Sequence, residues 1–460
     1  MFPRFCARTA CALALCFAAP ALAATDAELA EIRDQIRQLK DNYEARIRAL
    51  EERLKAAETA GVAPATATAA PVEVPPASTG PSAGTLAAFN PAISVVLQGT
   101  YAHLTQDPAL FGFDNLQIAP DVTPGRRGFG LGESEVNFSA SIDHLFAGSL
   151  TVSLAPDNSV DVEEAYGLVT ALPYGIVPKF GRFFSGIGYL NEQHQHVWDF
   201  QDAPLAYQAF LGGQFTQDGV QVKWVAPADT FIEFGAEAGN GDAFPGSPRN
   251  SNSAGAWSVY AHAGDDIGAS ASWRAGVSYL ETRAIDRVGK MPDITGAIAD
   301  TSFAGTTRTA IADVVWKYAP NGNTRETNFK VQGEYFWQRA RGDLTYAGNG
   351  ESAVTNTDAY SANQRGGYVQ GVWQFLPTWR VGMRYDRLSP GSPDYGSNAA
   401  FLATDAFDPQ RATVMFDWTP SEFSRLRVQY AQSRERPGFT DNQLFLQYIL
   451  TLGAHGAHKF

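Results

Sequence analysis

The stretch LFLQYILTLG (Leu444–Gly453) is almost wholly apolar and lies close to the end of the chain. Every second side chain in it is apolar, whereas polar residues interrupt the other row. The apolar row is Leu444, Leu446, Tyr448, Leu450 and Leu452, and the interruptions are Gln443, Gln447 and Thr451. Successive side chains of a β-strand point to opposite faces, so a repeat of two is typical of a strand. The stretch predicts a strand with one apolar and one mixed face.

The first 24 residues predict a secretory signal peptide. Arg4 and Arg8 precede an apolar stretch at residues 10–19, and small residues follow at 21–23, where a signal peptidase would cleave. All three cysteines lie within this segment. We therefore expect an exported mature chain without thiols or disulfides, which excludes thiol catalysis and cysteine-bound metals.

Charge and composition narrow the class further. Without Arg4 and Arg8, 33 Lys and Arg face 48 Asp and Glu, a formal charge of −15, which argues against a nucleic-acid partner. Aromatic residues reach 12%, and no stretch approaches the roughly twenty apolar residues of a membrane helix. A secreted all-β protein and an outer-membrane barrel remain.

Three regions follow the signal peptide. Residues 25–60 predict a periplasmic coiled-coil helix, with a single amphipathic helix lying on the barrel as the alternative. Residues 61–88, rich in Pro, Ala and Thr, predict a flexible linker. Residues 89–460 predict the barrel. The coiled-coil seam is Leu29, Ile32, Ile36, Leu39, Tyr43, Ile47, Leu50 and Leu54.

Residues 89–460 contain about sixteen strand-like stretches, separated alternately by short turns and long loops. In the stretch 379–386, Trp379, Val381 and Met383 share one side while Arg380 and Arg384 share the other. Charged residues on one face imply water on that side. We therefore predict an all-β, closed, antiparallel transmembrane β-barrel of about 16 strands with a hydrated interior.

Tryptophans on the apolar side predict a girdle at the membrane interface, and the last strand is expected to close against the first. An aromatic C-terminus, Phe460, resembles the signal by which the barrel assembly machinery recognises its clients. The tryptophans are Trp224, Trp257, Trp273, Trp316, Trp337, Trp373 and Trp418.

Four segments resemble proteobacterial outer-membrane porins related to the phosphate-selective porin O/P type, some of which are labelled zinc-regulated or TonB-dependent receptors. They are FNPAISVVLQG (Phe89–Gly99), GFGLGESEV (Gly128–Val136), GRFFSGIGYLNEQHQHVWDFQDAPLAYQAFLGGQ (Gly181–Gln214) and GAHGAHKF (453–460). The resemblance implies a trimeric, sixteen-stranded channel whose third long loop folds inward and narrows the pore. Residues 24–88 are too few for the plug of a TonB-dependent receptor.

The third loop holds the candidate constriction residues, and they are expected to face a basic wall. Opposed charges would create a transverse field that sorts solutes. The alternative is that the arginines are paired with Asp386, Glu334 or Glu135. The loop residues are Tyr189, Asn191, Glu192, His194, His196, Trp198, Asp199 and Asp202, and the wall residues are Arg274, Arg380, Arg384, Arg425 and Arg427.

His194 and His196, with Glu192 or Asp199, also resemble ligands for zinc or copper, although an H-x-H pair on an exposed loop is common without metal. A weaker pair lies at His455 and His458. No H-E-x-x-H motif is present, and the G-x-S-x-G match GPSAG at residues 80–84 lies in the predicted linker, not at the strand-to-helix turn that a nucleophile elbow needs. Glu163 and Glu164 are adjacent, so an ordinary strand would point them to opposite faces. We therefore predict neither an enzyme nor a cofactor.

The most economical function is passive diffusion of small hydrophilic solutes or ions through a homotrimeric porin in the outer membrane, in contact with its lipid. One alternative is an uptake receptor for a metal ion such as zinc. Another is a tether, in which the coiled coil binds the cell wall and the barrel is only an anchor.

Overall fold

The computed structural model describes residues 91–155, 159–348 and 354–453. The predicted signal peptide, coiled coil and linker lie outside these residues, as do His455, His458 and Phe460. No helix in the described part of the chain is long and apolar enough to cross a membrane.

Strands dominate the described residues. They are β1 (Ala92–Leu104), β2 (Gly128–Leu131), β3 (Ser134–Ser141), β4 (Phe146–Leu154), β5 (Val160–Val169), β6 (Ile176–Phe184), β7 (Thr216–Val225), β8 (Phe231–Gly239), β9 (Ala256–Ile267), β10 (Ala271–Pro292), β11 (Ile298–Tyr318), β12 (Asn328–Tyr346), β13 (Asn356–Leu376), β14 (Trp379–Ser389), β15 (Gln410–Ser421), β16 (Ser424–Arg436) and β17 (Phe439–Gly453). The helices are α2 (Leu205–Leu211) and the 3-10 turns η1 (Pro108–Leu110), η2 (Pro173–Gly175), η3 (Gln195–Val197), η4 (Pro320–Gly322) and η5 (Gly396–Ala400).

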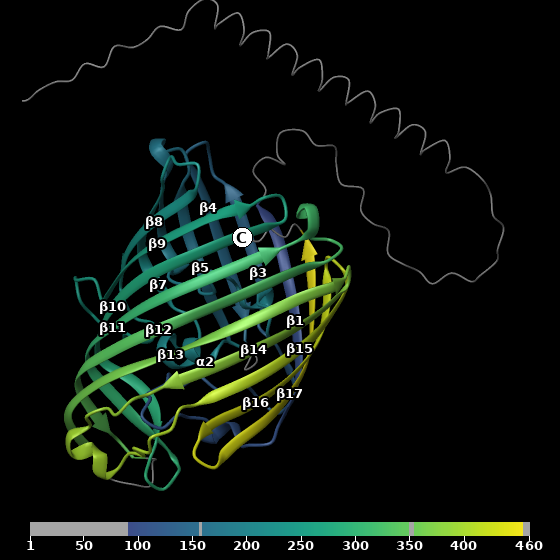
Figure 1. Ribbon diagram of the computed structural model, residues 1–460. Coiled ribbons are helices and arrows are strands. Elements are labelled where there is room, and N and C mark those ends of the chain that lie inside the picture. The colour runs from purple at the N-terminus through teal and green to yellow at the C-terminus, as the bar shows by residue number, and fades with distance from the viewer. Residues whose placement is uncertain (1–90, 156–158, 349–353, 454–460) are drawn as a thin grey trace, which may run out of the picture. The chain divides into compact units, whose positions relative to one another are not determined.

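The sheet closes on itself, as Figure 1 shows. The last strand β17 pairs with β1 from Ser94 opposite Gly453 to Leu104 opposite Gln443. The short strands β2 and β3 pair with successive stretches of β1 and so share one position in the wall. The seventeen described strands therefore occupy sixteen positions, and the predicted closed antiparallel barrel is confirmed.

The two faces of β17 agree with the prediction from the sequence. Leu446, Tyr448 and Leu450 are 43–44% exposed on the outside, whereas Gln443 and Gln447 are buried inside. An apolar outer face is stable only against other apolar material, because exposed apolar surface in water is unfavourable.

Aromatic side chains form two belts on the outer face. The lower belt, next to the short turns, contains Trp224, Trp273, Trp316, Trp373, Trp379 and Trp418, and the upper belt contains Trp257, Tyr279, Tyr335 and Trp337. On β12, Phe329 and Trp337 mark the two belts and are about 26 Å apart along the strand at ~3.3 Å per residue. Trp337 is not at a strand end, because β12 continues well beyond the upper belt.

Long loops fold against the inner wall. Loop L1 (residues 105–127) joins β1 to β2, and loop L3 (residues 185–215) joins β6 to β7 and carries α2. Phe113 of L1, Phe210 of L3 and Phe336 of β12 belong to one buried apolar core. The sequence pattern of the strands, with charged residues facing inward, did not predict this apolar layer. The layer depends on side chains of the loops, and the alternation of residues along the strands carries no information about them.

Candidate channel lumen and its charged walls

The base of L3 is fixed by one buried amide. The side chain of Asn191 donates to the carbonyl oxygens of Ser185 and Phe215, at 2.8 and 2.9 Å, and accepts from the backbone N–H of Phe215 at 2.8 Å. Asn191 is fully buried. These bonds join the two ends of L3 and satisfy backbone groups that would otherwise be buried without partners.

Glu334 of β12 holds the first turn of L3. Its carboxylate accepts from the backbone N–H groups of Tyr189 and Leu190, at 3.0 and 3.1 Å, and from the hydroxyls of Tyr207 and Tyr368, at 2.9 and 2.6 Å. Gly188 has φ +66°, and a Cβ there would lie 2.3 Å from Glu334 Oε2. Only glycine fits this turn, both for its conformation and for the close approach.

Two further carboxylates, on strands of the barrel, bind other parts of L3. Glu237 of β8 accepts from the Ser185 hydroxyl at 2.5 Å and from the Gly186 N–H at 2.8 Å. Asp386 of β14 accepts from the N–H of Leu205, the first residue of α2, at 2.9 Å. L3 is therefore attached to β8, β12 and β14 through charge-assisted hydrogen bonds, which are stronger than neutral ones.

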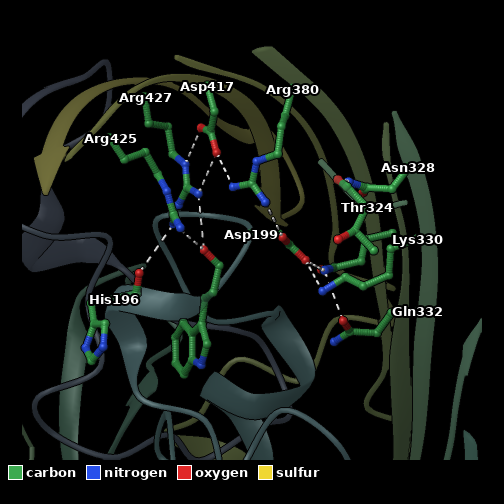
Figure 2. A network of polar contacts seen from close by, with 12 residues as sticks. His196, Asp199, Thr324, Asn328, Lys330, Gln332, Arg380, Asp417, Arg425 and Arg427 are labelled. Carbon is green, nitrogen blue, oxygen red and sulfur yellow. Dashed lines mark hydrogen bonds and ion pairs between the residues drawn. The ribbon is translucent and has the colours of Figure 1, made fainter. Parts of the chain in front are cut away.

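A basic wall faces one side of L3. We use this name for Lys330, Arg380, Arg384, Arg411, Arg425 and Arg427, which project inward from β12, β14, β15 and β16 (Figure 2 shows four of them). Asp199 of L3 contacts Lys330, and it contacts Arg380 at 3.3 Å. Asp417 of β15 bridges Arg380 and Arg427.

Burial and neighbouring cations act in opposite directions on the loop carboxylates. Burial raises the pKa of Asp199, but Lys330 and Arg380 outweigh it and lower the pKa to about 2. Burial likewise raises the pKa of Asp202, and Arg384 and Arg411, at 3.0 and 2.6 Å, lower it below its ordinary value. Both loop carboxylates are therefore ionised at neutral pH.

Arg425 differs from the other arginines of the basic wall. Its guanidinium donates to the carbonyl oxygens of His196 and Trp198, at 3.3 and 3.5 Å (Figure 2). Among the ion pairs of the described residues, Arg425 has no carboxylate within 4 Å. The charge of Arg425 is therefore the least compensated on this wall.

An acidic wall faces the other side of L3. We use this name for Glu135, Glu163, Glu164, Glu233 and Glu237, which project inward from β3, β5 and β8. The imidazole of His194 lies 3.3 Å from Glu135, 3.1 Å from Glu163 and 3.0 Å from Glu164, while His196 lies 2.9 Å from Glu135. L3 therefore presents imidazoles to the acidic wall and carboxylates to the basic wall.

The prediction that Glu163 and Glu164 point to opposite faces is wrong. The register of β4 and β5 shifts between Thr151 and Val152, which pair with Glu164 and Val162 and leave Glu163 as an extra residue. Such a bulge interrupts the alternation of side chains. Both carboxylates consequently reach His194 inside the barrel.

His194 is held as a cation by this arrangement. Burial lowers its pKa, but hydrogen bonds to Glu135, Glu163 and Glu164 outweigh burial and raise the pKa well above the ordinary value. The rings of His194 and His196 stack with their centroids 5.7 Å apart. Nδ1 of His194 and oxygens of Glu135 and Glu163 all lie within 4.8 Å of one another, a spacing that could hold a metal ion.

The predicted residues fall into distinct groups in the structure. Glu192, His194, His196, Asp199 and Asp202 contact charged groups of the walls. Tyr189, Asn191 and Trp198 are at most 5% exposed and stabilise L3 itself. Arg274 lies apart from the other arginines, over the Tyr189 ring and 3.7 Å from Asp313.

Several residues of the walls were not predicted. Lys330, Arg411 and Asp417 lie in the inward-facing rows of their strands, as the predicted arginines do in theirs. The alternation of side chains could therefore have indicated them. The partners of Glu334 on L3 are more than a hundred residues away in sequence, and no local signal marks them. Glu334 was named only as a possible partner of the arginines, and the wall residues missed altogether are Glu163, Glu164, Glu233, Glu237, Lys330, Arg411 and Asp417.

No protein-family model matches the chain. An uncharacterized protein of Aquifex aeolicus (strain VF5) is 32% identical over 356 residues, which is 73% of this chain and 71% of that protein.

Similar solved structures include three outer-membrane proteins. The trimer form of OmpT from Vibrio cholerae has 12% identity and a TM-score of 0.48, over 79% of this chain and 99% of that one. The outer membrane channel DcaP of Acinetobacter baumannii has 14% identity and a TM-score of 0.46, over 80% and 99%. The anion-selective porin from Comamonas acidovorans has 8% identity and a TM-score of 0.47, over 79% and 99%.

Proposed function

The chain belongs to the same family as the Aquifex aeolicus protein, and we propose that it is an outer-membrane porin for passive diffusion of small hydrophilic solutes or ions. L3 forms the constriction of this channel. The observation that carries the proposal is the separation of charge across the lumen, with the acidic wall on β3, β5 and β8 and the basic wall on β12 and β14–β16.

The outer face supports a place in a membrane. In hydrocarbon every backbone polar group must be paired within the protein, and a closed barrel meets this condition. At the strand tilt of ~35–45° usual in outer-membrane barrels, the two aromatic belts are roughly 20 Å apart along the barrel axis, comparable to the ~25 Å apolar band of such barrels. The belts and the closed sheet together favour an outer-membrane barrel over a secreted sandwich.

The walls are the hydrated part of the lumen. The side chains of Lys330 and Arg380 on the basic wall are each 20% exposed, and His194 beside the acidic wall is 23% exposed. In contrast, Phe113, Phe210 and Phe336 of the apolar core are not exposed at all. Solutes would therefore pass along L3 and the charged walls, where the transverse field orients dipoles and biases ions.

The remaining parts of the proposal concern assembly. A homotrimer in the outer membrane, inserted by the barrel assembly machinery, fits the porin-like barrel, and residues 25–60 would lie in the periplasm. No enzyme activity, cofactor or nucleic-acid partner is proposed.

Conductance in planar bilayers tests the channel. Purified full-length protein should produce step-like current increases in a salt solution. Absence of steps, under conditions in which a known porin conducts, would contradict the proposal.

A metal-ion receptor is a second candidate, favoured by the contacts of His194. Ligand atoms around a tetrahedral Zn²⁺ with bonds of ~2.0–2.1 Å lie about 3.3 Å apart. The imidazole Nδ1 of His194 lies 3.3 and 3.1 Å from carboxylate oxygens of Glu135 and Glu163, close to that spacing. Glu164 and His196 stand beside them as further ligands.

Calorimetric titration of the full chain with ZnCl₂ distinguishes this candidate. Binding should be lost in His194→Gln and retained in His103→Gln, because His103 is exposed on the outer face of β1. Equal binding by both variants, or none by the wild type, would exclude the site.

A tether to the cell wall is the third candidate. Deletion of residues 26–57 should leave conductance intact in a channel, whereas a tether would lose its attachment to the wall.

A further inference from the structure

A group of exposed arginines lies on the outer face of the barrel, beside the upper belt. Arg308 of β11, Arg339 of β12 and Arg365 of β13 share the outward side of their strands with Trp337. They line a groove of about 610 Å³, whose floor includes Tyr279 and Trp337. We call this feature the arginine groove.

The register places like charges next to each other. Arg308 lies directly opposite Arg339, and Arg365 lies directly opposite Trp337, one step from Arg339 along the sheet. Directly opposed residues of antiparallel strands have Cβ atoms about 4.5–5.5 Å apart, and like charges in such a pair repel. Anionic groups beside the arginines would offset this repulsion.

The protein supplies too few of these anions. Arg308 pairs with Glu281 at 2.8 Å, and Arg339 donates to the amide oxygen of Asn363 at 2.7 Å. Asp408 also lines the groove but pairs with Arg387 at 2.8 Å, and among the ion pairs of the described residues neither Arg339 nor Arg365 has a carboxylate partner. The groove therefore carries about two uncompensated positive charges at neutral pH.

We propose that the arginine groove binds the phosphate groups of a phosphorylated glycolipid in the outer leaflet. The inference rests on the proposed function, because it requires the outer face to lie in the outer membrane. Interfacial aromatic residues lie at headgroup level, so the arginines beside the upper belt meet headgroups rather than acyl chains. A guanidinium matches phosphate oxygens with two parallel hydrogen bonds, and the rings of Tyr279 and Trp337 offer apolar surface to the lipid below.

Direct binding of lipid A tests the inference. The full chain in detergent with EDTA is titrated with bisphosphorylated lipid A and, separately, with the same lipid after removal of its phosphates, and bound lipid is measured by native mass spectrometry. The wild type should bind the phosphorylated lipid at least about tenfold more tightly, a difference of ~1.4 kcal/mol. The double variant Arg339→Gln/Arg365→Gln should lose this preference.

A matched control removes the same amount of positive charge elsewhere on the outer face of the barrel. Arg283 and Arg341 are exposed on the outer face but do not line the groove, so Arg283→Gln/Arg341→Gln should keep the preference. Equal binding of the two lipids by the wild type, or equal loss in both double variants, would overturn the inference. A third outcome would also overturn the inference: the wild type shows no lipid preference, and Arg339→Gln/Arg365→Gln dissociates an oligomer. In that case the groove would be occupied by a second copy of this chain.

Conductance of the same preparations separates this inference from the channel. The groove lies outside the barrel, so Arg339→Gln/Arg365→Gln should conduct like the wild type. A phosphate preference without any conductance would support the groove while contradicting the channel.

Discussion

Glu163 and Glu164 are consecutive residues of β5, yet both contact the imidazole of His194, at 3.1 and 3.0 Å. The bulge at Glu163 turns two neighbouring carboxylates to the same side of the sheet. The acidic wall therefore contacts His194 with carboxylates at both ring nitrogens, in addition to its contacts with His196, Ser185 and Gly186. These contacts oppose the contacts of Asp199 and Asp202 with the basic wall, so L3 is held from two sides.

Replacement of Glu164 tests the contact with the acidic wall. Glu164→Ala removes the acceptor of His194 Nε2 and of the backbone N–H of Phe184, and hydrogen bonds to charged groups contribute about 1.5–3 kcal/mol. The free energy of unfolding in detergent and urea should fall by about 2 kcal/mol. Asp161→Ala on the same strand is the control, because Asp161 is exposed and should change it little. Equal effects of the two changes would mean that the His194 contact adds nothing.

Glu334→Ala should detach the first turn of L3. The change leaves two backbone N–H groups and two tyrosine hydroxyls without their acceptor, and each buried unsatisfied group costs about 1–3 kcal/mol. We expect faster proteolysis within L3 and noisier single-channel currents, measured on the same preparation. Glu422→Ala, in the short turn between β15 and β16, is the control. Unchanged proteolysis in Glu334→Ala would show that the other anchors suffice.

The barrel was predictable because alternation is a local property. Trp379, Arg380 and Val381 already indicate which side of β14 faces outward, and the same reading succeeds for β17. The anchors of L3 were not predictable in this way. Glu334 contacts residues more than a hundred positions away, and the bulge at Glu163 depends on the register with β4 rather than on the composition of β5.

Acid should release L3 from the basic wall within a defined range. Burial raises the pKa of Asp199, but Lys330 and Arg380 lower the pKa to about 2, against 3.8 for an aspartate exposed in the unfolded chain. A carboxyl with a lowered pKa stabilises the fold fully above the unfolded value and loses this contribution as the pH falls through the folded value. Conductance should be steady down to about pH 4 and change between about pH 4 and 2. In Asp199→Asn this transition should be smaller, because only Asp202 would still titrate against the basic wall.

Reversal of one charge on the basic wall should shift ion selectivity. Arg425 has the least compensated charge, so Arg425→Glu should increase the cation-to-anion permeability ratio by at least about twofold, because a lumenal charge acts at short range with little screening. The measurement is the reversal potential across a tenfold KCl gradient, with ~0.1 M KCl on one side of the bilayer and ~1 M on the other. Arg387→Glu is the control, because Arg387 is 61% exposed on the outer face. An equal shift in both variants would place Arg425 outside the ion path.

A charge placed between the two aromatic belts tests the position of the barrel in the bilayer. Val369 is 53% exposed on the outer face of β13, and Ala359 lies on the same face of the same strand, ten residues nearer the loops and beyond the upper belt. An arginine near the bilayer centre costs about 2–4 kcal/mol, falling to about 0–1 kcal/mol near the interface. Val369→Arg should therefore make folding into lipid vesicles less favourable by about 3 kcal/mol, and Ala359→Arg should leave the free energy of folding nearly unchanged. Similar small costs at both positions would mean that water, not lipid, surrounds the belt region, and the outer-membrane channel would have to be abandoned.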